Sequence, residues 1–92
     1  MIITVEYFGQ LQHITGCRTE SVEVAEETDV RTLLKQIAER YDERFRDFVF
    51  SADGQLRKSI PILVDDRQIR AEDSNPFRDG ARLMILSPIA GG

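Results

Sequence analysis

The sequence has few of the residues from which covalent and metal-based sites are built. Its single cysteine, Cys17, cannot form an intrachain disulfide, and it cannot make a zinc or iron–sulfur site that needs four cysteine ligands. The single histidine, His13, has no second ligand at a metal-binding spacing. We therefore interpret Cys17 as a structural or incidental thiol and His13 as a surface residue, and we predict no metal site. The scarcity of cysteine favours a reducing, cytoplasmic location.

Signatures of export, membrane insertion and common catalysis are also missing. The first residues lack the basic region and cleavage site of a secretory signal, and no apolar run approaches the roughly 18 residues that span a bilayer. The sequence contains no glycine-rich phosphate loop and no paired histidines of the zinc-protease kind. A net charge of −4 would repel the phosphates of nucleic acid. We expect neither a membrane nor a nucleic-acid partner, and the sequence contains none of the usual catalytic signatures.

What the chain does contain is the composition of one small globular domain, with 92 residues that are 41% hydrophobic and 30% charged. Alternation of apolar and polar residues predicts a strand over residues 2–8, in which Ile3, Val5 and Tyr7 share one face. Residues 19–24 alternate again, after a turn or helical stub. These two segments predict a hairpin at the start of the chain.

Helical spacing follows. Either Thr28 or Asp29 can cap a helix, and the apolar residues behind them recur every three or four positions. These residues are Val30, Leu33, Leu34, Ile37, Ala38 and Tyr41. A single apolar stripe predicts that this helix covers one face of a sheet.

The second half of the chain supplies the remaining strands. We interpret residues 42–50 as a turn running into a short strand, because their aromatic residues fit neither period cleanly. Residues 60–64 predict a strand at or near a sheet edge, since Pro61 cannot donate to a ladder, and Asp65-Asp66 predicts a turn. Residues 81–87 are apolar on both faces, which favours a central strand.

This element order predicts an α+β fold, a ubiquitin-like β-grasp roll in which one main helix packs across one face of a mixed sheet. We assign the domain to residues 1–87 and a flexible tail to residues 88–92. The last strand is expected to return beside the first.

The chemistry of the chain is predicted at its end. After Pro88 the sequence closes with Gly91 and Gly92, and glycine, having no Cβ, can thread a slot that side chains would block. A C-terminal carboxylate activated by adenylation becomes an acyl electrophile, which sulfur attacks to give a thiocarboxylate, and which a cysteine or amine attacks to give a thioester or amide. The alternative is an end without any function.

The chain resembles the small sulfur carriers of the MoaD/ThiS family, typified by the small subunit of molybdopterin synthase and the thiamine sulfur carrier. The resemblance lies in ITVEYFG at residues 3–9, in Leu33 and Leu34, in DGARL at residues 79–83 and in SPIAGG at residues 87–92. It implies that an E1-like enzyme adenylates Gly92 with ATP and that the product is a C-terminal thiocarboxylate, with no cofactor bound by the carrier. Gly91, which has no side chain, would allow the tail to enter a narrow channel in the partner.

The resemblance further implies that the chain is a co-substrate or a non-catalytic subunit rather than an enzyme. Its partners would be the E1-like enzyme and the large synthase subunit or another sulfur-accepting enzyme. Molybdopterin synthesis is the favoured route. Ser87 stands where those subunits typically carry a first proline, and residues 42–60 resemble the carriers of cysteine synthesis. Cysteine or thiamine synthesis, and a ubiquitin-like modifier or interaction domain, remain open.

Apolar residues also fall on the sheet face that the helix is expected to leave uncovered. Phe8, Leu63, Met84 and Leu86 lie there by alternation, where a solvated sheet would show polar residues. We predict that this face docks a partner, together with Pro88 and Ile89 of the tail. The alternative is that a loop folds over it.

Overall fold

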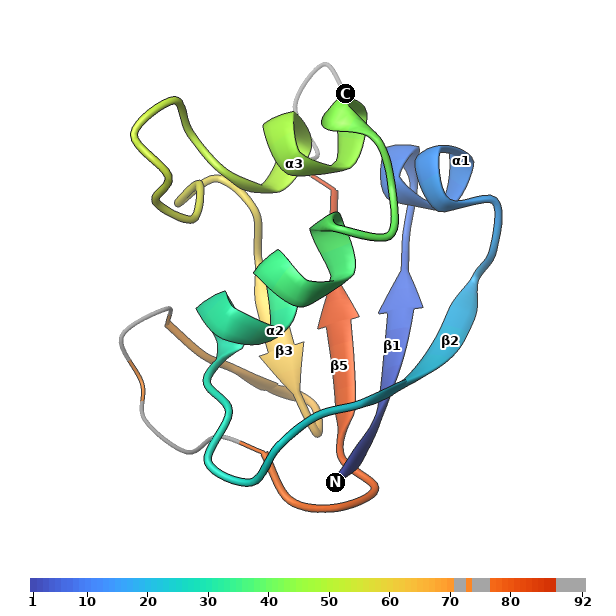
Figure 1. Cartoon of the computed structure of the whole chain (residues 1–92), viewed down its shortest axis with the longest axis vertical. Helices are drawn as coiled ribbons and strands as arrows, with labels where there is room; N and C mark the ends of the chain where they lie inside the picture. The colour runs from blue at the N-terminus through green and yellow to red at the C-terminus, as the bar shows by residue number, and fades with distance from the viewer. Residues whose placement is uncertain (71–72, 74–76, 88–92) are drawn as a thin grey trace.

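The computed structural model describes residues 1–70, 73 and 77–87 (Figure 1). The elements in this part of the chain are β1 (Ile2–Tyr7), α1 (Gln10–Thr15), β2 (Thr19–Glu23), α2 (Val30–Ala38), α3 (Glu43–Val49), β3 (Ile62–Val64), β4 (Arg67–Gln68) and β5 (Arg82–Ile85). Asn75 and Pro76, which predict a loop from the sequence, lie outside the described residues. So does the whole predicted tail, including Pro88, Ile89, Gly91 and Gly92. The division into a domain and a tail therefore stays a prediction.

The strands form a mixed sheet in the order β2-β1-β5-β3-β4. β1 runs antiparallel to β2 and parallel to β5, and β5 runs antiparallel to β3. The last strand thus lies at the centre of the sheet beside the first, which confirms the predicted α+β architecture. At the tip of the β3–β4 hairpin, Asp65 and Asp66 take φ values of 49° and 70°, which is the backbone that a two-residue hairpin turn needs.

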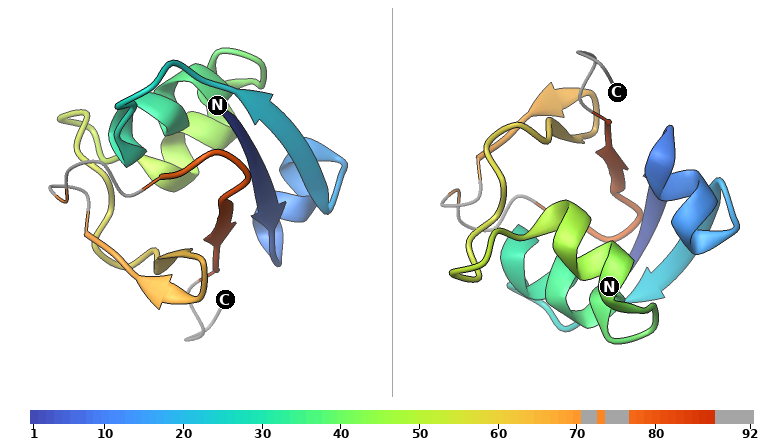
Figure 2. Two further views of the ribbon diagram at one scale, coloured as in Figure 1. Left: turned by 90° about the horizontal axis from the view of Figure 1, so that it is seen from below. Right: turned by 90° about the horizontal axis from the view of Figure 1, so that it is seen from above.

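Alternation and helical spacing place the core where the sequence predicts it. Ile3 and Val5 on β1 are completely buried, as is Leu83 on the neighbouring β5. The Asp29 side chain caps α2 by accepting a hydrogen bond of 2.8 Å from the Thr32 amide. The views in Figure 2 show the sheet curving around α2 and α3, which lie on one of its faces.

The interpretation of residues 42–50 as a turn and short strand is wrong. This segment forms α3, capped by the Asp42 carboxylate, which accepts a hydrogen bond of 2.9 Å from the Arg44 amide. Phe45 and Val49, four residues apart, are completely buried on one face of that helix. Phe50 makes only an isolated bridge. The helical period was obscured because the helix is two turns long and buries only two side chains.

The other boundaries differ by a few residues. β3 begins at Ile62, after Pro61, and β5 ends at Ile85. The Pro61 carbonyl accepts a hydrogen bond of 3.0 Å from the Leu86 amide, so the proline joins the sheet only as an acceptor. No helix in the described ranges is long and apolar enough to cross a membrane.

Candidate functional site

The sheet face opposite α2 and α3 carries the predicted docking residues. In the pairing register, Leu63 on β3 lies opposite Met84 on β5, and Met84 lies opposite Glu6 on β1. Because cross-strand partners share a face, these side chains form one row across three strands. Gln68 on β4 extends the row beyond Leu63 to the sheet edge.

Phe8 and Leu86 lie at one end of this face. Phe8 directly follows β1 and Leu86 directly follows β5, and the two strands are parallel, so both residues lie at the same end of the sheet. We refer to Phe8, Leu63, Met84 and Leu86 as the open-face patch. All four are half-buried. Other half-buried apolar side chains of the described residues pack against the core, but these four do not. Their binding role stays a prediction.

An ion pair borders the patch. Arg82 on β5 contacts Glu6 on β1, with 2.9 Å between guanidinium nitrogen and carboxylate oxygen. The Arg82 side chain is 57% exposed, so this pair is hydrated and adds little stability of its own. Its place beside Met84 gives the face a polar border next to an apolar centre, as protein interfaces commonly have.

The end of the described chain is held on two sides. Ser87 Oγ donates a hydrogen bond of 2.9 Å to the Phe8 carbonyl and accepts one of 3.2 Å from the Gln10 amide. On the other side, the Leu86 amide donates to the Pro61 carbonyl. The chain therefore leaves the sheet from a fixed point, which we call the tail root, beside the open-face patch.

Gly9 makes the contact with Ser87 possible. Its backbone, at φ 58° and ψ −126°, is one that residues with a side chain rarely adopt. A Cβ built on Gly9 would lie only 2.9 Å from the Ser87 Cβ and closer still to its hydroxyl. From the sequence, Gly9 marked only the end of a strand and Ser87 only a departure from a family pattern. Their proximity had no local signal.

Comparison with known proteins decides the family. The model of the ThiS family matches residues 5–92, which is nearly the whole chain. The chain belongs to the ThiS family. This is the family of ubiquitin-like sulfur carriers that the N-terminal, helical and C-terminal motifs resemble, so the predicted family is confirmed.

Relatives of this ThiS-family chain carry several names. A ubiquitin-related modifier 1 from Ajellomyces capsulatus is 27% identical over 106 residues, covering 100% of this chain and 88% of the relative. A molybdopterin synthase sulfur carrier subunit from Caenorhabditis briggsae is 26% identical, with 98% of this chain and 96% of the relative covered.

Solved structures agree on the fold. SAMP1 from Haloferax volcanii superimposes with a TM-score of 0.87 at 23% identity, with both chains covered completely. A chain of the BexX/CysO complex from Amycolatopsis orientalis gives a TM-score of 0.69 at 28% identity, covering 98% of this chain and 99% of that one. The ubiquitin-like β-grasp fold predicted from the element order is thereby confirmed.

Cys17 lies in a polar cluster under the sheet, away from the open-face patch. Its thiol is 3.6 Å from a Glu20 carboxylate oxygen and 3.9 Å from the Tyr41 hydroxyl, which donates to the same carboxylate. Burial, followed by the Glu20 charge, raises the pKa of Tyr7 far above its ordinary value, and burial likewise raises the pKa of Tyr41. Both phenols are neutral at physiological pH. This surrounding fits a structural thiol.

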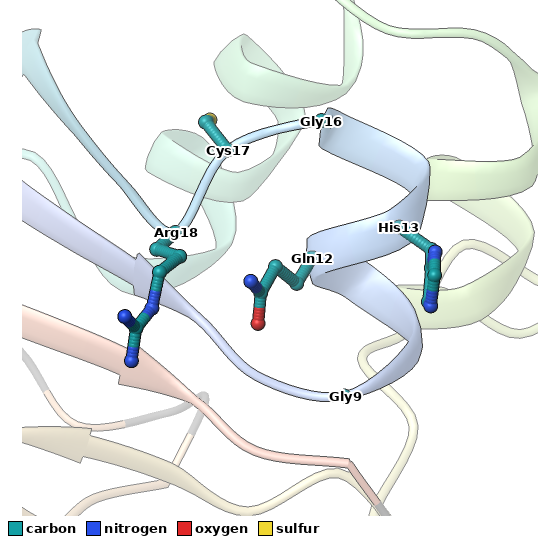
Figure 3. Close-up of a pocket in the computed structure, with 6 residues that line it drawn as sticks. All are labelled: Gly9, Gln12, His13, Gly16, Cys17 and Arg18. Carbon is teal, nitrogen blue, oxygen red and sulfur yellow. The ribbon is translucent and has the colours of Figure 1, made fainter.

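His13 and Cys17 both border an open cavity of about 580 Å³ along α1 (Figure 3). Figure 3 shows the side chains of Gln12, on α1, and of Arg18, which directly precedes β2, lying near each other, whereas the Cys17 thiol points away from His13. The two therefore do not form a nucleophile–base pair. His13 is exposed, as predicted. Within the described ranges, no group of three or more potential metal ligands occurs.

Proposed function

We propose that this protein is a sulfur carrier whose C-terminal Gly92 is adenylated and converted to a thiocarboxylate. Its place in the ThiS family supports this proposal. The observation that carries it in the structure is the tail root, because Ser87 is anchored at the end of the central strand with five residues of sequence still to follow.

The chemistry needs only the backbone carboxylate and partners that bring the reagents. A carboxylate oxygen of Gly92 attacks the α-phosphorus of ATP on the E1-like enzyme and displaces pyrophosphate. Hydrosulfide then attacks the carbonyl carbon and AMP leaves, so one oxygen of the carboxylate is replaced by sulfur. The carrier itself binds no cofactor in this scheme and acts as a co-substrate rather than as an enzyme.

The length of the tail allows the open-face patch to bind a partner while the Gly92 carboxylate reacts some distance away. The five residues after Ser87 span about 17 Å at most when fully extended. The open-face patch can therefore dock on a partner surface while the carboxylate reaches a catalytic centre inside that partner. Gly91 would pass through the narrow entrance of the partner's catalytic centre, since it has no side chain. Pro88 and Ile89 would contact the partner outside that entrance.

For the acceptor, we favour the large subunit of molybdopterin synthase, and hence a role in molybdenum cofactor synthesis. The relative from Caenorhabditis briggsae, named a molybdopterin synthase sulfur carrier subunit, supports this choice. Carriers of the cysteine or thiamine pathways are alternatives, and the similarity to a chain of the BexX/CysO complex supports protein acceptors more generally. A cytoplasmic location is part of the proposal, supported by the single cysteine.

A second candidate is a protein modifier, favoured by the relative named ubiquitin-related modifier 1. Both functions begin with the same adenylate at Gly92. They separate at the next step, because a lysine amine that attacks the activated carbonyl leaves an amide-linked conjugate instead of a thiocarboxylate.

Intact-protein mass spectrometry tests the proposal. The full chain is incubated with the E1-like enzyme of its own organism, ATP and sulfide, and a chain lacking Gly91 and Gly92 serves as the control. Replacement of one oxygen by sulfur in the full chain alone supports the carrier. Conjugates with other proteins and no sulfur-containing product would overturn it in favour of the modifier. Sulfur transfer to the purified large synthase subunit then tests the acceptor.

A further inference from the structure

The two hydrogen bonds of Ser87 join it to residues that lie 79 and 77 positions earlier in the chain. Its hydroxyl donates to the Phe8 carbonyl and accepts from the Gln10 amide. These two bonds attach the end of β5 to the turn between β1 and α1. We call this arrangement the Ser87 clasp. The Ser87 hydroxyl is both a donor and an acceptor in this arrangement, so its position and its direction are fixed.

The clasp acts with a second attachment one residue earlier. The Leu86 amide is bonded to the Pro61 carbonyl at 3.0 Å, so the tail root is tied both to the turn after β1 and to the segment that leads into β3. These attachments come from the chain segments that directly adjoin β1 and β3, the two neighbours of β5 in the sheet. With both in place, the backbone at Ser87 has little freedom to pivot.

Gly9 has a close fit to Ser87 that other glycines in left-handed backbone do not show. A Cβ at Gly9 would meet the Ser87 side chain, whereas a Cβ at Gly16 or Gly80 would meet nothing within 4 Å. The absence of a side chain at Gly9 therefore does more than permit a turn. It brings the Phe8 carbonyl and the Gln10 amide within reach of one hydroxyl.

We propose that Ser87 is a positioning residue, which sets the direction in which the tail leaves the sheet so that the Gly92 carboxylate arrives in line for activation. This inference rests on the proposed sulfur-carrier function. Without the clasp, the backbone at Ser87 can adopt more conformations. The entropy of these conformations is lost each time the Gly92 carboxylate binds in the active site of the E1-like enzyme. Misplacement of a reacting atom by about 1 Å already costs on the order of a hundredfold in rate.

The expected effect is on the rate of the adenylation step rather than on docking. Loss of the clasp frees the backbone of about one residue, and fixing that residue again raises the barrier to adenylation. We therefore expect kcat to fall about tenfold. The open-face patch is unchanged by a substitution at Ser87, so the KM for the carrier should stay within about twofold. A defect in folding or docking would instead appear in KM.

ATP–pyrophosphate exchange with the E1-like enzyme measures both constants for the full chain and for Ser87→Ala. Ser87→Thr keeps the hydroxyl and should retain most of the kcat. Ser51→Ala is the matched control, because Ser51 also donates to a backbone carbonyl, that of Gln55, and lies far from the tail in the sequence. It should leave both constants unchanged. Hydrogen exchange at the Gln10 amide reports the clasp directly, and should accelerate in Ser87→Ala alone.

Each outcome is decisive. Lower kcat with constant KM and faster exchange at Gln10, both restored in Ser87→Thr, supports the inference. A kcat for Ser87→Ala equal to that of the unchanged chain overturns it, as does a rise in KM alone, an unchanged exchange rate at Gln10, or a low kcat in Ser87→Thr with Gln10 still protected. Absence of pyrophosphate exchange by the unchanged chain would instead overturn the proposed function.

Discussion

Leu63 and Met84 are cross-strand partners on β3 and β5, and their alternation with the buried residues of both strands puts them on the sheet face opposite α2 and α3. Both are half-buried, whereas their chain neighbours Ile62 and Leu83, which point to the opposite face, are buried. As cross-strand partners they are close enough to shield one another, and they place apolar side chains at the centre of the sheet, beside the tail root.

Met84→Asp is therefore expected to weaken docking. Placing a carboxylate in a desolvated interface should cost about 2 kcal/mol, or roughly thirtyfold in Kd, for the E1-like enzyme or the sulfur acceptor. The free energy of unfolding should fall by only about 1 kcal/mol, since the side chain is not in the core. Calorimetric titration gives the Kd, and circular dichroism monitors the fold.

The control for this prediction is Gln68→Asp, which adds the same charge at the edge of the same row. It should leave the Kd within about twofold, because rim positions contribute little. Unfolding of the Met84 variant would mean that its side chain belongs to the core, and equal losses for both variants would mean that charge alone governs binding.

Gly9→Ala should destabilise the protein more than Gly16→Ala. Both glycines have positive φ, so each substitution strains the backbone by about 1 to 2 kcal/mol. Only at Gly9 does the new methyl group also collide with Ser87, and only there does ψ lie near −126°. Urea denaturation should show a further loss of about 1 kcal/mol or more at Gly9. Equal losses would show that the turn relaxes without strain.

The sequence predicted the elements whose period runs long enough to be recognised. β1 alternates over six residues, and α2 repeats its apolar stripe over more than two turns. α3 was missed because seven residues with two buried side chains do not establish a period, even though Asp42 supplies an ordinary cap. Burial of Phe45 and Val49 in the core favours the helix in a segment whose local pattern is ambiguous.

The candidate site divides in the same way. The open-face patch could be predicted, because alternation fixes which side chains share a face once a strand is recognised. The contact between Gly9 and Ser87 could not, because it joins residues that are distant in sequence and depends on the parallel pairing of β1 and β5. Only the folded sheet brings Gly9 and Ser87 together.

Cys17→Ala should leave sulfur transfer intact. The thiol contacts Glu20 and Tyr41 and points away from His13, so nothing in its surroundings provides a sulfur relay. Thiocarboxylate formation should proceed at the unchanged rate, with a loss of stability of about 1 kcal/mol from the lost packing and weak hydrogen bond. A rate reduced more than tenfold, with the fold retained, would assign the thiol a chemical role.

The cap of α2 should make stability depend on pH. A hydrogen bond from the Thr32 amide lowers the pKa of Asp29 below its ordinary value, so the folded state favours the charged carboxylate. The stabilisation is present above the unfolded pKa of about 3.9 and is lost as the pH falls through the lower folded pKa. Asp29→Ala should thus cost about 1 kcal/mol at pH 7.

Urea denaturation at pH 7 and at about pH 2 to 3 checks this prediction. The difference between the unchanged chain and Asp29→Ala should shrink at the lower pH. Asp29→Asn is the control, since its neutral amide oxygen caps the helix at both pH values. A difference for Asp29→Ala that does not change with pH would show that the charge of the carboxylate plays no part.

The sharpest prediction concerns the last residue. Removing Gly91 and Gly92, or adding one residue after Gly92, should abolish adenylation, because the carboxylate must reach the α-phosphorus in line and about 1 Å of displacement costs on the order of a hundredfold. Gly91→Val should be nearly as damaging, since a β-branched side chain restricts φ and widens a segment that must pass through a slot. ATP–pyrophosphate exchange measures the step.

Docking separates this prediction from a general loss of binding. The open-face patch is intact in all three variants, so their Kd for the E1-like enzyme should stay within about tenfold of that of the unchanged chain. Lost exchange with retained binding would locate the chemistry at Gly92. Full exchange with the truncated chain would refute the carrier, because the carboxylate that reacts would then not be that of Gly92.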